Sequence, residues 1–516
     1  MIPKVKTFAN LWLQWYEITV EADENRALPT IEIIGLPDAA IRESKERLRA
    51  TFRNVGITLP KRKFVLNLSP SDIKKVGTSF DVPMAIAMLF LLSEGKIHYA
   101  EQIADFLFFG ELGLDGEIKR VNGLLPCVVS AMKQWYKHFF VPAENVYELE
   151  YVPGIHIYPL TTFFQIIQYF LHGDPFVVID QAKDIEQLFD KEQWYDLDFE
   201  HIKGHILAKR ALAIAAAGLH NIVMVGAPGS WKTMLSKALQ SILPPLGFEE
   251  ILEVSQIYSV VGKLNKDSPL IIKRPFRQIH HTASKISITG GGSNLTPGEV
   301  SLAHKGILFF DELTEFPREV LEVLRQPIED KAVVISRVAW TIQYPANFMF
   351  VAAMNPCKCW YHKDPEKACI CSITDIKKYQ SKISWPLLDR IDMILEIPRE
   401  NIDKILDRGK GESSESMRAK VINARKIQQT RFAGTGIFSN AQMGPKHLEQ
   451  YITLDEQSKS FLSEASRKLI LSPRVVHRTI KLARTIADME GAVEITVQHL
   501  AEAMQYRSRT MFVEME

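Results

Sequence analysis

The sequence has few of the features that would place it in a specialised class of protein. Its 62 basic and 61 acidic residues give a net charge of +1, so composition offers no general attraction for nucleic acid. The longest apolar run, residues 82–92, is too short to span a bilayer. The opening MIPKVKTFAN lacks the apolar core of a signal peptide. We therefore expect a cytoplasmic protein that has no membrane partner.

Cysteine and glycine are also scarce. Four of the five cysteines lie within residues 357–371, which favours a reduced compartment and a metal site over a disulfide framework. The fifth, Cys127, lies in an apolar run and is expected in the core. Glycine makes up 27 of 516 residues, about 5%, against a usual share of roughly 7%. If the eight tryptophans were counted as glycines, the glycine content would lie near the usual share.

The apolar pattern divides the chain into three blocks and a linker. Residues 1–170 mix strand-like and helical runs and predict an α+β or α/β domain. An acidic linker is expected over 171–200. Residues 201–398 alternate buried strands with helices, as in an α/β fold with a parallel sheet, and 399–516 are mostly helical and charged. We expect strands at 30–34, 63–68, 106–109, 138–141, 221–225, 307–310, 348–354 and 393–397, and helices at 38–54 and 83–92.

Residues 226–233, GAPGSWKT, match the phosphate-binding loop G-x-x-x-x-G-K-[ST] except at one position. A buried strand precedes the loop and a helix follows it, which is the context that such a loop requires. Its backbone N–H groups would surround the phosphates, Lys232 would contact the β- and γ-phosphates, and Thr233 would bind Mg²⁺. Trp231 stands where the last glycine belongs, and an indole there would block the close approach of the backbone. The nucleotide-binding residues are therefore Gly226, Ala227, Pro228, Gly229, Ser230, Trp231, Lys232 and Thr233.

A second buried strand, in GILFFDEL (306–313), ends in two carboxylates. Asp311 would help to hold Mg²⁺, and Glu312 would polarise the attacking water. Alone, the pair fits a solvated strand end equally well. Asn355, at the end of another strand, could orient the water, and Arg390 could reach a neighbouring subunit's γ-phosphate as an arginine finger. By spacing alone, a surface or capping role fits Asn355 and Arg390 better.

Several long strings resemble the magnesium-chelatase-like AAA+ family of the ComM/YifB type, over nearly the whole chain. The resemblance implies a Lon-protease-like N-terminal domain, an AAA+ core with a loop near Gly290–Gly292 that reaches a central pore, and a C-terminal helical lid in which Arg474 senses nucleotide. It also implies an ATP- and Mg²⁺-dependent homo-hexameric ring that translocates single-stranded or branched DNA. A motor subunit for metal insertion and a Lon-like protease are the alternatives. The strings are RPFRQIHHTAS (274–284), GGGSNLTPGEVSLAHKGILFFDELTEF (290–316), LEVLRQPIEDKAVVISR (321–337), VAAMNPCKC (351–359), LLDRID (387–392), ARTIADMEG (483–491), IIGLPDAAIRESKERLRA (33–50) and FDVPMAIAML (80–89).

The resemblance also bears on protease activity. A Lon-type site needs a nucleophilic serine and a lysine that activates it. Ser79 lies roughly where the family places the serine, but Leu125 lies near the position expected for the lysine. We therefore expect Ser79 to be a loop hydroxyl, and the N-terminal domain to be structural or a platform for partners.

The cysteine cluster forms a C-x-C…C-x-C pattern from Cys357, Cys359, Cys369 and Cys371, with His362 in the intervening loop. Four thiolates can satisfy a tetrahedral Zn²⁺. The one-residue spacing is tighter than is usual for zinc, so a reduced cluster without metal is the alternative. A metal here would lie close to Asn355 in the sequence and would fix the geometry beside the γ-phosphate.

Seven of the eight tryptophans align with family glycines. We hypothesise that these positions are UGA codons, translated as tryptophan on paper but read as glycine by the organism, so that the phosphate-binding loop is GAPGSGKT. The alternative is a degenerate ATPase that has lost its loop. UGG codons would end the hypothesis. The aligned residues are Trp12, Trp15, Trp135, Trp231, Trp340, Trp360 and Trp385, whereas Trp194 lies in the unaligned linker.

Overall fold

The computed structural model describes residues 2–11, 14–93, 95–191, 195, 197–292, 296–337, 340–364, 366–400, 411–469 and 471–507. The chain forms two compact units, of which the first joins Met1–Glu192 to Phe248–Ile272 and the second joins Gln193–Gly247 to Lys273–Glu516. The expected mixed α/β architecture, with a parallel sheet and a helical C-terminal region, is confirmed. The boundaries expected at 170, 200 and 398 stay predictions.

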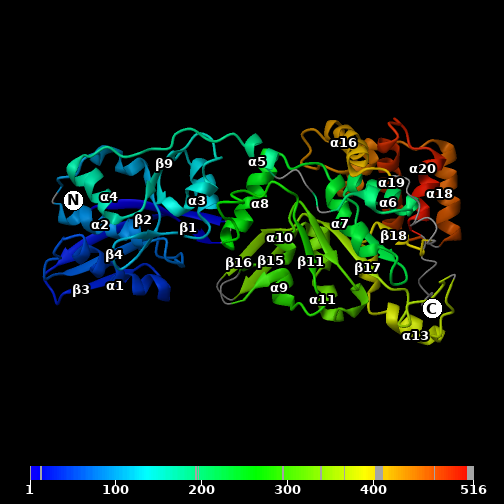
Figure 1. Ribbon diagram of the computed structural model, residues 1–516, viewed down its shortest axis with the longest axis horizontal. Helices are drawn as coiled ribbons and strands as arrows, with labels where there is room; N and C mark the ends of the chain where they lie inside the picture. The colour runs from blue at the N-terminus through cyan, green and yellow to red at the C-terminus, as the bar shows by residue number, and fades with distance from the viewer. Residues whose placement is uncertain are drawn as a thin grey trace. The chain divides into compact units, whose positions relative to one another are not determined.

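The first unit is built on a mixed seven-stranded sheet in the order β3-β4-β2-β1-β5-β8-β9 (Figure 1). A long antiparallel hairpin of β1 and β2 supplies its centre, and no strand was expected there from the sequence. The four strands expected from the sequence all lie in this sheet, within one or two residues of their expected ends. The strands are β1 (Lys4–Leu11), β2 (Gln14–Asn25), β3 (Thr30–Ile34), β4 (Lys63–Ser69), β5 (Phe106–Phe108), β8 (His138–Pro142) and β9 (His156–Leu160).

Helices α1 (Ala39–Asn54), α2 (Asp81–Leu92) and α3 (Leu124–Met132) complete the first unit. Helix α2 is apolar on every side and almost wholly buried, so it forms the middle of the core. Its first residue, Asp81, is buried and accepts a 2.6 Å hydrogen bond from Nε of Arg47 on α1. Because a buried carboxylate needs such partners, this pair fixes how α1 and α2 cross.

Helix α8 (Phe248–Val260) belongs to the first unit, although it lies between two elements of the second unit in the sequence. The Ser259 carbonyl accepts from the Gly123 N–H at 3.0 Å, and its hydroxyl donates to the buried Glu148 carboxylate at 2.6 Å. Arg120 also donates to the Leu264 carbonyl at 2.9 Å. These bonds attach both α8 and the segment after it to the first unit.

The second unit contains a five-stranded parallel sheet in the order β11-β14-β17-β10-β18. The side chains of β10, β14 and β17 are buried along their whole length, which explains their continuous apolar sequences. Because the strands are parallel, the residues that follow them meet at one edge of the sheet. The strands are β11 (Phe276–Ile279), β14 (Ile307–Phe310), β17 (Met349–Met354), β10 (Ile222–Val225) and β18 (Met393–Glu396).

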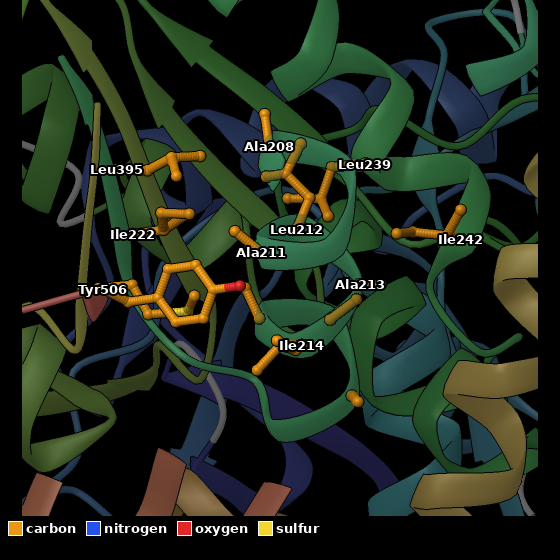
Figure 2. Packing of buried hydrophobic residues seen from close by; sticks show 14 of the residues in the cluster. Ala208, Ala211, Leu212, Ala213, Ile214, Ile222, Leu239, Ile242, Leu395 and Tyr506 are labelled. Carbon is orange, nitrogen blue, oxygen red and sulfur yellow. The ribbon is translucent and has the colours of Figure 1, made fainter. Parts of the chain in front are cut away.

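The core of the second unit joins this sheet to the C-terminal helices. Figure 2 shows the alanine-rich helix α6 (Ile206–Gly218) packed among Ile222 and Leu395 of the sheet, Leu239 and Ile242 of α7 (Lys232–Ile242), and Tyr506. Small side chains on α6 let its neighbours approach closely. The C-terminal helices are α16 (Ser414–Arg431), α17 (Pro445–Tyr451), α18 (Glu456–Lys468), α19 (Pro473–Met489) and α20 (Val497–Gln505).

Candidate functional site

The loop 226–231 connects the interior strand β10 to the first turn of α7. Gly226 is required by packing, because a Cβ there would lie 2.3 Å from the Ile397 carbonyl oxygen. The Ser230 hydroxyl donates to the Ala227 carbonyl at 2.8 Å and closes the loop. Trp231 is the N-terminal cap of α7, with φ 62° and ψ 13°. The loop and helix therefore have the arrangement that presents backbone N–H groups to an anion.

Lys232 points back over this loop. Its ammonium donates to the carbonyls of Gly226 at 2.7 Å and Ala227 at 2.9 Å. Burial lowers the pKa of Lys232 to about 8, against the opposing effect of the Asp311 and Glu312 carboxylates. A desolvated ammonium beside a loop of N–H groups is suited to bind a polyanion such as a phosphate chain.

Thr233 and Asp311 meet across the sheet edge. The Thr233 hydroxyl donates to Oδ2 of Asp311 at 2.9 Å, so the residue after β14 contacts the helix that follows β10. Hydroxyl and carboxylate oxygens are hard ligands of the kind that Mg²⁺ prefers. The pair is therefore a candidate magnesium site.

Glu312 lies beside this pair with a left-handed backbone, φ 52°, and its N–H donates to Oδ1 of Asp311 at 3.0 Å. Its carboxylate is 56% exposed, and Oε2 lies 3.9 Å from Nδ1 of His281. Sequence reasoning missed His281, although a pair of histidines directly after β11 was a visible signal. The left-handed backbone of Glu312 is a strained conformation, and such strain is frequent where a side chain must face a ligand.

A cavity of about 470 Å³ brings most of the expected nucleotide-site residues together. Its lining combines the loop with the carboxylates after β14, the amide after β17 and one residue of the cysteine loop. This convergence follows from the parallel sheet, because all of these side chains leave the same edge. The lining residues are Pro228, Gly229, Ser230, Trp231, Lys232, Thr233, Met234, Asp311, Glu312, Ala353, Met354, Asn355 and Trp360.

The two arginines expected near nucleotide lie elsewhere. Arg390 follows α14 (Trp385–Leu388), donates to the Pro386 carbonyl at 2.7 Å and pairs with the Glu329 carboxylate. It lines a separate cavity of about 660 Å³. Arg474 is exposed in the first turn of α19. Within one described chain, neither arginine lines the nucleotide cavity, so their roles stay predictions that concern a neighbouring subunit and the lid.

Ser79 lines a smaller cavity of about 220 Å³ in the first unit. Cys127, the only titratable residue of the described lining, lies on α3 and is buried as expected, and burial raises the pKa of its thiol. Leu125 is fully buried on the same helix. Among the residues described around this cavity there is no lysine, histidine or carboxylate that could activate Ser79.

The four clustered cysteines converge. Sγ of Cys357 lies 3.4 Å from Sγ of Cys359 and 3.7 Å from Sγ of Cys369, and the last two sulfurs are 3.4 Å apart. With Cys371, all four sulfurs lie within 4.8 Å of one another. Because a metal–sulfur distance near 2.3 Å separates tetrahedral ligands by about 3.8 Å, the cluster can hold a metal ion.

Three of the six tryptophans that the structure describes have a left-handed backbone: Trp135 at φ 72°, Trp231 at 62° and Trp360 at 76°. This conformation costs an L-residue about 1–2 kcal/mol, whereas glycine adopts it freely. Trp15 lies within β2, and Trp340 and Trp385 begin β16 (Trp340–Pro345) and α14. Trp12 and Trp194 lie outside the described residues.

Comparisons with known proteins identify the family of this chain. The family model described as magnesium chelatase, subunit ChlI, matches residues 198–405, and related models match residues 20–145 and the C-terminal residues 411–507. Competence protein ComM of Haemophilus influenzae is 36% identical over 97% of this chain and 96% of its own length. The chain belongs to the magnesium-chelatase-like family of the ComM type.

Other relatives match the chain to different extents. YifB of Escherichia coli is 35% identical over 98% of this chain and 96% of its own length. The 67 kDa magnesium-chelatase subunit of Chlorobaculum tepidum is 27% identical over 31% of this chain and 23% of its own length. None of the helices in the described part of the chain is both long and apolar enough to cross a membrane.

Proposed function

We propose that the chain is a cytoplasmic AAA+ ATPase that works as a ring, a hexamer, and translocates single-stranded or branched DNA. The observation that carries the ATPase assignment is the single cavity in which Lys232, Thr233, Asp311, Glu312 and Asn355 converge. This is the set of groups that binds a nucleoside triphosphate and activates water in P-loop enzymes. Family membership over nearly the whole chain supports the same assignment.

The proposed site residues then have distinct tasks. Lys232 and the loop N–H groups bind the phosphates, and Thr233 and Asp311 hold Mg²⁺, which when bound neutralises phosphate charge. Glu312 accepts a proton from the attacking water, while the Asn355 amide orients that water. Arg390 acts on the nucleotide of a neighbouring subunit, and Arg474 contacts nucleotide when the helical lid closes.

The assignment requires a small residue at position 231. The left-handed backbone at Trp135, Trp231 and Trp360 supports the hypothesis that UGA codons are read as glycine, because these three positions favour glycine in physical terms as well. A degenerate ATPase would have no reason to place tryptophan at strained positions in three separate segments. The codons of the gene and the intact mass of the native protein decide between the two.

The DNA substrate is supported by the name of the relative, competence protein ComM. We propose separately that the first unit is a Lon-like domain without protease activity. A magnesium-chelatase-type motor for metal insertion is less well supported, since the chelatase subunit matches only 31% of this chain. A Lon-like protease is disfavoured by the absence of a base in the described lining around Ser79.

Zinc is the metal that we propose for Cys357, Cys359, Cys369 and Cys371. Four thiolates with no carboxylate are a soft ligand set, which suits Zn²⁺ and excludes Mg²⁺ or Ca²⁺ as a preferred occupant. A closed set of four protein ligands leaves no position for a substrate, so the metal would be structural.

The decisive test uses the full-length chain decoded as its gene requires. ATP hydrolysis is measured with no DNA, with single-stranded DNA and with branched DNA, and the chain with tryptophan at position 231 is the matched control. We expect the glycine form to bind and hydrolyse ATP, DNA to stimulate it, and the control to do neither. Failure of the glycine form to bind ATP would refute the motor. Hydrolysis without a DNA response would favour metal insertion, and peptide cleavage removed by Ser79→Ala would favour the protease.

A further inference from the structure

The cysteine cluster and the nucleotide cavity share a wall. Asn355 and Trp360 both line the cavity, and Cys357 and Cys359 lie between them in the sequence. The Trp360 N–H donates to the Cys357 carbonyl at 3.0 Å, which makes residues 357–360 a tight turn. Cys357 therefore lies two residues after Asn355, and the turn that holds this cysteine ends at Trp360, in the cavity wall.

A second connection runs through helix α13 (Ile373–Gln380), which begins two residues after Cys371. At its other end, the Gln380 amide donates to the Pro356 carbonyl at 2.8 Å, in the segment between Asn355 and the first cysteine. Next to it, the Tyr379 hydroxyl accepts from the Thr314 hydroxyl at 2.5 Å, two residues after Glu312. Helix α13 thus contacts both the turn that carries Asp311 and Glu312 and the segment that carries Asn355.

The cysteine loop exposes much of its apolar surface, although an ion pair of 3.3 Å joins its Asp364 to Arg399. Ile370, between the last two cysteines, is 88% exposed, and Ile373, at the start of α13, is 67% exposed. A segment that buries so little apolar surface has a low local stability unless a cross-link fixes it. Four metal–thiolate bonds provide such a cross-link, since metal-binding free energy becomes local folding free energy.

We propose that Zn²⁺ at the four cysteines positions Asn355 and Glu312, and so controls the hydrolysis step and leaves nucleotide binding unchanged. This inference rests on the proposed ATPase function. Nucleotide is bound chiefly by the 226–231 loop, Lys232 and Thr233, which leave β10 and have no described hydrogen bond to the cysteine loop or α13. The metal is thus expected to affect kcat and not the dissociation constant. The four cysteines are positioning residues.

The test compares the zinc-loaded full-length chain with the same chain after chelation and with a Cys369→Ser/Cys371→Ser variant. Cys127→Ser is the matched control, because this cysteine is buried outside the cluster. Metal per chain is measured by elemental analysis, nucleotide affinity by titration, and turnover by steady-state hydrolysis. We expect one zinc per chain in the native protein and in the control. Loss of the metal should lower kcat by about 10- to 100-fold while the dissociation constant changes less than about twofold.

Hydrogen exchange of residues 311–316 gives a readout that does not depend on activity. Loss of zinc should speed exchange there and leave exchange in 222–225 unchanged, and the control should behave as the native chain. Native protein without zinc, or a metal-free chain whose turnover and exchange are unchanged, would overturn the inference. Loss of ATP binding together with the metal would also overturn it. Should the zinc-loaded chain bind no ATP, the proposed function fails, and the exchange of 311–316 still decides whether the metal positions this turn.

Discussion

The left-handed backbone at Trp135 allows a sharp test of whether glycine belongs there. The Trp135 N–H donates to the Met132 carbonyl at 3.0 Å and the Tyr136 N–H to the Ala131 carbonyl at 3.2 Å, which is the hydrogen-bond pattern of a Schellman motif at the end of α3. Trp135 occupies the position in this motif that glycine usually fills. Its side chain is 87% exposed, so little packing is lost when the indole is removed.

The expected gain follows from these two facts. Relief of the left-handed strain is worth about 1–2 kcal/mol, and the greater freedom of glycine in the unfolded chain offsets about 0.4–1 kcal/mol. Trp135→Gly should therefore raise the free energy of unfolding by about 0.8 kcal/mol, the difference between the midpoints of the two ranges. Trp135→Ala, which keeps a Cβ, should leave it close to that of the parent chain.

Thermal and denaturant unfolding of the parent, the Gly form and the Ala form measure this difference. For a unit of about 200 residues, 1 kcal/mol corresponds to a shift in Tm of about 2–4 °C. If the Gly form is more stable than the Ala form, and the Ala form is about as stable as the Trp parent, the Cβ is the cause of the strain. Equal stability of the Gly and Ala forms, or a Gly form below the Ala form, would refute the reasoning and weaken the case for glycine at position 231.

The remaining predictions concern the nucleotide site and a buried ion pair. Glu312→Gln should keep ATP binding and lower kcat by about 10²–10⁴-fold, as nucleotide titration and hydrolysis assays would show; a parallel loss of binding would contradict its role as base. Arg390→Ala should leave nucleotide binding nearly intact and abolish turnover by the ring, and lost binding would argue against a finger. Burial alone would raise the pKa of Asp392, but the Arg478 guanidinium holds this pKa well below its ordinary value of 3.8. The ionised carboxylate therefore stabilises the fold at any pH above 3.8, and this stabilisation is lost as the pH falls from 3.8 through the lowered pKa of the folded chain. Asp392→Asn should cost about 3 kcal/mol at pH 7 and flatten the acid dependence of unfolding, and an unchanged acid dependence would contradict this.

The sequence predicted the parts of the fold that depend on local pattern. Strands β10, β14 and β17 are continuous apolar runs, and parallel strands buried on both faces need such runs. The polar residues after them could be expected to meet, because a parallel sheet brings its strand ends to one edge. The cavity that contains Lys232, Asp311 and Asn355 follows from that geometry.

Features set by distant contacts could not be predicted in this way. The amphipathic pattern of α8 indicates a helix but does not say which surface it covers, and the structure places it on the first unit. Two arginines one turn apart on α19 have different environments: Arg474 is exposed, whereas Arg478 pairs with Asp392 on the segment before β18. Nothing in their spacing distinguishes them, since the partner lies 86 residues away.

The course of the chain through α8 limits how this protein can be dissected. A fragment that starts at residue 201 would carry α8 without the surface that covers Ile251, Val254 and Ile257, all of them buried in the intact chain. A fragment that stops at residue 192 would leave the buried Glu148 carboxylate without the Ser259 hydroxyl. Neither cut yields a self-sufficient piece, so a truncation that aggregates or loses activity would report the damage of the cut and say little about the task of the part removed.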